Sequence, residues 1–191
     1  MGKEVERAQI AVDKAKEGKR VVMVSSGDPG VYGMAGVVLE VAAKDKTPVP
    51  VEIVPGVTAA TAASAILGAP LVSDFAVISL SDLLTPWEKI ECRLEAAASA
   101  DFSIVLYNPQ SQGRIEPLAK AYEIMLKYIN PKTPVGIVRQ AGREGENCTI
   151  TTLKDMLNCE IDMVTTIVVG NSATKVVNGK MVTARGYDFS S

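Results

Sequence analysis

The 191-residue sequence predicts an α/β protein with two domains. Short apolar segments of strand length alternate along it with segments in which apolar residues recur at helical spacing. Gly, Pro and Asn follow most of the apolar segments and mark the turns. The pattern of apolar residues changes after Gly68 and Pro70. We therefore expect an N-terminal α/β domain over residues 1–70 and a C-terminal α/β domain over residues 71–191.

The N-terminal part begins with an amphipathic helix, because Val5, Ala8, Val12 and Ala15 recur every three or four residues. The expected elements are, in order, a helix from about residue 5 to 18, a strand at 20–25, a helix at 31–44, a strand at 51–54 and a helix at 58–67. Two strands do not easily form an independent sheet. This part is therefore expected to need further strands, or to pack against the second domain or a partner chain.

The C-terminal part continues the alternation of strands and helices. The helix at 115–129 shows the clearest stripe of core positions in the chain. The other expected elements are strands at 75–80, 102–107, 135–139, 148–152 and 165–169, and a helix around residues 90–97.

Composition excludes several function classes. The chain is 47% hydrophobic and 22% charged, as in packed globular proteins. Its net charge of −2 argues against a nucleic-acid partner. It contains no His, which excludes Ser-His-Asp and Cys-His nucleophiles and every metal site that contains His. The three Cys residues lack C-x-x-C spacing, so we expect reduced thiols, a cytoplasmic protein and no protein metal site.

Neither a signal peptide nor a membrane span is expected. The N-terminal residues are charged and contain no apolar segment of signal-peptide type. Residues 53–73 carry no charge, but Pro55 and Pro70 interrupt them and most of their side chains are small. We interpret this stretch as a strand end, a turn and a buried helix.

Four strand ends carry residues that suit a ligand site. They are 25–33 (SSGDPGVYG), 55–60 (PGVTAA), 107–109 (YNP) and 139–143 (RQAGR). Ligands of open α/β sheets bind beyond the carboxyl ends of the strands, so four such clusters favour one shared crevice. The first cluster is neither a Walker loop nor G-x-G-x-x-G. The alternative is ordinary turns, with Asp28 or Thr58 capping a helix.

Taken together, the segments resemble the tetrapyrrole methylases, which use S-adenosylmethionine. The resemblance follows family order and spacing across nearly the whole chain. The segments that carry it are GKEVERA at 2–8, SSGDPGVYGMAG at 25–36, VEIVPGVTAATAASAILGAPL at 51–71, FAVISLSDLLTPW at 75–87, VLYNPQS at 105–111, VGIVRQAGREGE at 135–146 and TTIVVGNS at 165–172. GDPGVYGMAG, SLSDLLTPW and YNPQS are typical of the subgroup that methylates carbon 17 of a corrin precursor.

The resemblance implies where the site lies. It predicts two α/β domains with S-adenosyl-L-methionine in the cleft between them. The residues that match cofactor-binding positions are Ser26, Gly27, Asp28, Val31, Thr58, Ala59, Asn108 and Ala141. Arg114, Arg139 and Arg143 are expected to bind substrate carboxylates, or else to be solvated surface charges. Asp28 and Tyr32 are the candidates for proton movement, but neither is assigned as a general base.

The implied reaction is methyl transfer to carbon 17 of precorrin-3B or cobalt-precorrin-3, coupled to ring contraction in cobalamin biosynthesis, by a homodimer acting on a corrinoid. The family's first strand and its G-x-G-P-G loop are absent, so we expect an N-terminally truncated form. Two alternatives stay open. One is another enzyme of the family, similar to diphthine synthases or ribosomal RNA methylases. The other is a non-catalytic subunit to which a partner supplies the missing strand.

Overall fold

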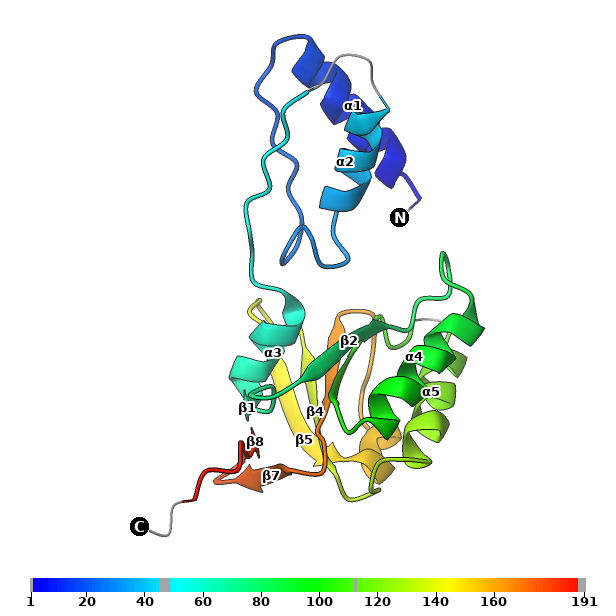
Figure 1. Ribbon diagram of the computed structural model, residues 1–191, viewed down its shortest axis with the longest axis vertical. Helices are drawn as coiled ribbons and strands as arrows, with labels where there is room; N and C mark the ends of the chain where they lie inside the picture. The colour runs from blue at the N-terminus through cyan, green and yellow to red at the C-terminus, as the bar shows by residue number, and fades with distance from the viewer. Residues whose placement is uncertain (1, 45–48, 112, 189–191) are drawn as a thin grey trace. The chain divides into compact units, whose positions relative to one another are not determined.

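The structure, a computed structural model, describes residues 2–44, 49–111 and 113–188 and is mixed α/β, as the sequence predicts (Figure 1). The chain divides into two compact units, Met1–Thr58 and Ala59–Ser191. Helix α3 (Ala59–Leu67) packs on the sheet of the second unit, whereas the sequence assigned this segment to the N-terminal domain. The predicted domain boundary at residue 70 therefore lies later in the chain than the boundary between the two compact units. As a boundary between domains it stays a prediction.

Unit 1 is built on two helices that pack side by side (Figure 1). Helix α1 (Glu4–Lys16) confirms the first predicted helix, with acidic side chains in its first turn and basic ones in its last. These charges are opposite in sign to the helix dipole at each end, which stabilises the helix. Helix α2 (Ala35–Ala43) completes a small core made by Ala8, Val12, Val41 and Ala42.

The predicted strands at 20–25 and 51–54 are wrong, because the structure assigns no strand to either segment. Both lie in extended coil, and Val22 and Val24 are 84% and 83% exposed. A strand requires a neighbour that pairs with its N–H and C=O groups. Among the described residues of unit 1, no strand provides that pairing.

Helix α2 also begins later than predicted, at Ala35 instead of residue 31. Tyr32 has a φ of +52°, which no helix accommodates. A Cβ on Gly33 would lie 2.6 Å from the carbonyl oxygen of Pro29, so the turn at this point requires glycine.

Unit 2 contains a five-stranded sheet that confirms all five strands predicted in this part of the chain. Its order is β2 (Phe75–Ser79), β3 (Ser103–Tyr107), β6 (Thr165–Val169), β4 (Pro134–Arg139) and β5 (Asn147–Thr152). Strand β2 is parallel to β3, whereas β6 is antiparallel to both β3 and β4. The carboxyl ends of β2, β3 and β4 consequently lie at the same edge of the sheet.

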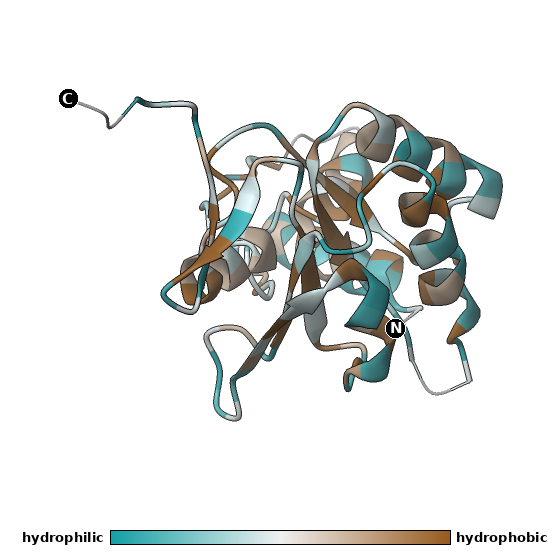
Figure 2. Cartoon of the chain, turned by 90° about the horizontal axis from the view of Figure 1, so that it is seen from below, coloured by the Kyte–Doolittle hydropathy of each residue, from teal (hydrophilic) through white to brown (hydrophobic). Residues whose placement is uncertain are grey.

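The central strands of this sheet, β3, β6 and β4, are buried on both faces. Helices α4 (Trp87–Ser99) and α5 (Glu116–Leu126) cover one face, where Ile104 and Leu106 join their core. Val105, between these two residues, belongs to the second core with α3, as the two-residue period of a strand requires. Figure 2 shows the hydrophobic residues concentrated along the strands and the hydrophilic ones on the outer helical surface.

A second, three-stranded sheet was not predicted. It consists of β1 (Gly68–Ala69), β8 (Lys180–Thr183) and β7 (Thr174–Val177), and a 3-10 helix, Leu153–Asn158, was missed as well. The turn between β7 and β8 is Asn178-Gly179, with φ values of +49° and +73°. Asn-Gly is a strong signal for a two-residue hairpin, so the sequence did contain the information.

Candidate functional site

In unit 1, the Asp28 carboxylate joins the two predicted ligand loops. Its Oδ1 accepts a hydrogen bond from the N–H of Gly30 at 2.8 Å, and its Oδ2 accepts one from the N–H of Gly56 at 2.9 Å. A Cβ on Gly56 would lie 2.3 Å from the carbonyl oxygen of Gly27. The loops therefore approach as closely as glycine allows.

This geometry gives Asp28 a structural role. Hydrogen bonds from the N–H groups of Gly56 and Gly30 lower the pKa of the Asp28 carboxyl. An ionised carboxylate with a lowered pKa and two donors in place is a poor proton acceptor. Asp28 does not cap α2 either, because that helix begins at Ala35. The carboxylate instead closes a turn on Gly30, as Asp side chains often do.

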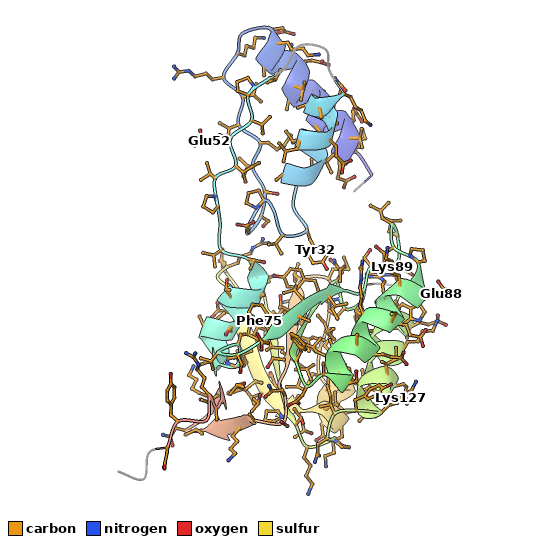
Figure 3. The ribbon with its side chains drawn as sticks, in the orientation of Figure 1. Tyr32, Glu52, Phe75, Glu88, Lys89 and Lys127 are labelled. Atoms are coloured by element: carbon orange, nitrogen blue, oxygen red, sulfur yellow. The ribbon has the colours of Figure 1, made fainter. Side chains whose placement is uncertain are left out.

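The other unit 1 candidates surround this turn. Ser26 and Gly27 are exposed, and the N–H of Val31 donates to the Asp28 carbonyl at 3.3 Å. Tyr32, labelled in Figure 3, lies in the loop before α2 with its side chain 59% exposed. Thr58, the last residue of unit 1, is half-buried.

In unit 2, Asn108 connects the carboxyl ends of β2 and β3. Its Nδ2 donates to the Ser79 Oγ at 2.8 Å, and its φ is +51°. The preceding residue, Tyr107, was not singled out by itself in the sequence, yet its hydroxyl accepts the N–H of Ala60 at 2.6 Å. This bond anchors the start of α3, which begins at Ala59.

Arg114 holds the same two strand ends. Its guanidinium donates to the Leu80 carbonyl at 2.9 Å and to the Asn108 carbonyl at 3.1 Å, and it lies 3.3 Å from Asp82. A guanidinium presents its donors in a fixed fork, so these bonds define how the two loops leave the sheet. Arg114 therefore positions the two loops, and its predicted contact with substrate carboxylates stays a prediction.

Arg139, at the carboxyl end of β4, is paired with Asp162. The Arg139 Nε donates to the Asp162 Oδ2 at 2.7 Å. The Asp162 Oδ1 accepts the Thr165 hydroxyl at 2.7 Å and the Val164 N–H at 3.0 Å. Burial raises the pKa of the Asp162 carboxyl, but the hydrogen bonds that it accepts outweigh burial and leave this pKa below its ordinary value.

Ala141 and Arg143 follow Arg139 in a tight turn. The N–H of Arg143 donates to the Gln140 carbonyl at 2.9 Å, and Gln140 has a φ of +51°. Arg143 is exposed, whereas Ala141 is half-buried against the core that contains Val138.

Comparison with known proteins identifies the family. The model of the tetrapyrrole (corrin/porphyrin) methylases matches residues 2–157. The chain belongs to this family. The predicted resemblance is thereby confirmed.

Named relatives of this methylase match almost the whole chain. The cobalt-factor III methyltransferase of Priestia megaterium is 52% identical, over 98% of this chain and 35% of that protein. The probable cobalt-factor III C(17)-methyltransferase of Salmonella typhimurium is 50% identical, over 98% of this chain and 78% of that protein. The precorrin-3B C(17)-methyltransferase of a Sinorhizobium species is 44% identical, over 91% and 70%. The methylase chain thus spans from about a third to about four fifths of these relatives.

Solved structures agree with the fold. The methyltransferase CobJ superposes with a TM-score of 0.88 at 38% identity, over 95% of this chain and 77% of that one. The cobalt precorrin-4 methyltransferase CbiF superposes with a TM-score of 0.68 at 28% identity, over 86% and 70%.

Within each unit of the methylase, the structure brings several of the predicted residues together. Ser26, Gly27, Asp28 and Val31 form one loop in unit 1, and Asn108, Arg139 and Ala141 lie at one edge of the unit 2 sheet. Among the described residues, no group of three or more His, Cys, Asp or Glu side chains is placed to hold a metal ion. None of the described helices has the length and apolar character to cross a membrane.

The Asp162 carboxyl gives the methylase a predictable acid sensitivity. Because its pKa is lowered on folding, its contribution to stability is present above the unfolded pKa of about 3.9 and is lost as pH falls through the folded value. We expect Asp162→Asn to melt at a lower temperature than wild type at pH 6, and this difference to fade below about pH 4. Melting curves from pH 6 to pH 2.5 measure it. Arg139→Gln should reduce the same difference, and identical acid profiles of wild type and Asp162→Asn would contradict the prediction.

Proposed function

We propose that this chain transfers a methyl group from S-adenosyl-L-methionine to carbon 17 of precorrin-3B or its cobalt counterpart, coupled to ring contraction in cobalamin biosynthesis. The observation that carries the proposal is the 50% identity with the Salmonella relative over 98% of this chain and 78% of that protein. We further propose a homodimer in the cytoplasm and no nucleic-acid partner, in keeping with a net charge of −2.

The residues of unit 1 fit the cofactor. Asp28 accepts its two hydrogen bonds through its side-chain carboxylate. Ser26 and Gly27 in the same loop, and Gly56 in the facing loop, remain exposed. Such a surface suits a ligand that is recognised through main-chain groups and needs close approach. We propose that Ser26, Gly27, Val31, Thr58, Ala59, Asn108 and Ala141 hold the cofactor, and that Asp28 fixes the loop. When bound, S-adenosyl-L-methionine supplies an electrophilic methyl group.

The residues proposed to orient the substrate come from unit 2. Arg139 and Arg143 suit the carboxylates of a tetrapyrrole, and the bond from Arg139 Nε to Asp162 fixes the direction of the guanidinium. Arg114 acts indirectly, through the two loops that it holds. For proton movement we favour Tyr32 over Asp28, since the lowered pKa of Asp28 makes that carboxylate a weak base. Holding the substrate carbon in line with the methyl group of the cofactor contributes much of the rate in such transfers.

Two measurements on the purified chain test the proposal. Calorimetric titration with S-adenosylhomocysteine should show saturable binding near one per chain. Incubation with methyl-labelled S-adenosyl-L-methionine and cobalt-factor III should yield a product carrying one additional methyl group at carbon 17, and uroporphyrinogen III is the control substrate. A folded chain that binds S-adenosylhomocysteine but labels neither compound contradicts the substrate assignment. A folded chain that does not bind S-adenosylhomocysteine contradicts the cofactor assignment as well.

A second candidate is favoured by the exposed valines of unit 1. Segments 20–25 and 49–54 both line a hollow of about 410 Å³, together with apolar side chains of α1 and α2. Unpaired extended backbone beside apolar side chains is the surface that an additional β-strand covers. The alternative role is therefore a subunit whose activity requires such a strand. If so, binding of such a strand should raise the affinity for S-adenosylhomocysteine and protect the amides of 20–25 from hydrogen exchange.

A further inference from the structure

The loop after β2, residues 80–86, presents two leucines to the surroundings. Leu83 is 73% exposed and Leu84 is 93% exposed. The base of this loop is fixed, because the Arg114 guanidinium donates to the Leu80 carbonyl at 2.9 Å and to Asp82 at 3.3 Å. An anchored loop with an apolar tip is a feature of contact surfaces.

Two hollows connect this loop with the neighbouring strand ends. The first, of about 150 Å³, is lined by Asp82, Trp87 and Gly113. The second, of about 620 Å³, is lined by Gly113, Ile115, Met163, Val164 and other residues. Because Gly113 lines both, the surface continues from the leucine loop to the segment before β6.

The second hollow combines an apolar wall with a charged margin. Ile115 is 67% exposed and Val164 is 42% exposed, so its wall offers large apolar side chains to a ligand. Asp162 also lines this hollow, and its Oδ2 lies 2.7 Å from the Nε of Arg139. A tetrapyrrole has the complementary form, a flat apolar ring with carboxylates around its edge. The volume lies within the range of about 300–1,000 Å³ that is typical of small-molecule sites.

We propose that the leucine loop and this hollow hold an apolar face of the tetrapyrrole ring, and that Leu84 and Ile115 select the substrate. The inference rests on the proposed function and adds to it the residues that recognise the ring. It assigns the exposed leucines to the substrate instead of to a second copy of the chain, because the leucine loop is continuous with a concave surface beside the arginine of β4.

The single tryptophan of the chain allows a direct test. Trp87 follows the leucine loop and lines the first hollow, which adjoins the second at Gly113, so a tetrapyrrole bound to the loop and the second hollow should quench its fluorescence. We expect Leu84→Asp and Ile115→Asp each to raise the Kd for cobalt-factor III about tenfold, since each removes apolar contact and adds a charge repelled by the substrate carboxylates. The Kd for S-adenosylhomocysteine should not change. Val177→Asp, at a half-exposed valine of β7 in the other sheet, is the matched control.

The outcomes separate this inference from the proposed function. If wild type, Leu84→Asp and Ile115→Asp all bind cobalt-factor III with the same Kd, the inference is wrong and the proposed function stands. Wild type that binds neither cobalt-factor III nor S-adenosylhomocysteine overturns both. If Leu84→Asp dissociates a dimer in sedimentation while its Kd for cobalt-factor III is unchanged, the leucine loop is an interface between copies and the inference is wrong.

Discussion

Replacing Gly56 by alanine is expected to weaken binding of S-adenosylhomocysteine roughly ten- to a hundredfold. The new Cβ would lie 2.3 Å from the Gly27 carbonyl oxygen and 3.3 Å from the Asp28 Cα, and both neighbours are main-chain atoms. Main chain does not yield as a flexible side chain does, so the two loops must separate. Separation breaks the 2.9 Å bond from the Gly56 N–H to Asp28. Overpacking of this kind costs about 1–3 kcal/mol, and each 1.4 kcal/mol is about tenfold in affinity.

A glycine of the same unit provides the control. Gly36 lies in α2, and a Cβ added there meets no atom within 4 Å. Gly36→Ala should therefore leave the affinity unchanged and stabilise the helix by up to about 1 kcal/mol. Calorimetric titration of the three proteins measures the comparison. Equal affinities of Gly56→Ala and wild type would show that the joined loops do not form the cofactor site.

The sequence predicted unit 2 better than unit 1 for a physical reason. The central strands of unit 2, β3, β4 and β6, are buried on both faces, so their apolar runs have one interpretation, and the register follows once the neighbours pair. The run at 20–25 is equally apolar, but apolar character only makes a segment suited to a sheet. The pairing groups must come from another strand, and a local pattern contains no information about whether that strand is present.

In the candidate site, the sequence predicted the positions of residues better than the contacts of their side chains. The strand-end rule located Asn108 and Arg139 at one edge of the sheet, because chain direction alone brings those positions together. The rule did not predict what the side chains do there. Arg114 was expected at the substrate, and Asp28 was expected at the cofactor and as a candidate for proton movement. In the structure both side chains hold loops through main-chain groups. Such bonds depend on loops brought together from distant parts of the sequence, so residue type and spacing do not reveal them.

Close packing between α3 and the sheet gives the largest expected effect on stability. A Cβ on Gly136, in β4, would lie 2.3 Å from both Cδ atoms of Leu67. Alanine is intrinsically better than glycine in a strand by about 0.5–1 kcal/mol, but Leu67 is fully buried and has no room to retreat. We expect Gly136→Ala to destabilise unit 2 by about 1–3 kcal/mol. Leu67→Ala, which leaves a cavity at the same place, should cost about 2–5 kcal/mol.

The double variant distinguishes packing at this contact from a general loss of stability. In Leu67→Ala with Gly136→Ala, the new methyl group enters the space that the leucine vacated, so the combined cost should fall short of the sum by about 0.5–3 kcal/mol. Leu94, fully buried in α4 on the opposite face, is the matched control, and its replacement by alanine should add independently to Gly136→Ala. Urea unfolding at constant m-value measures all five variants. Additive costs for the Leu67 pair would mean that α3 shifts along the sheet, and that the close approach at Gly136 does not fix its position.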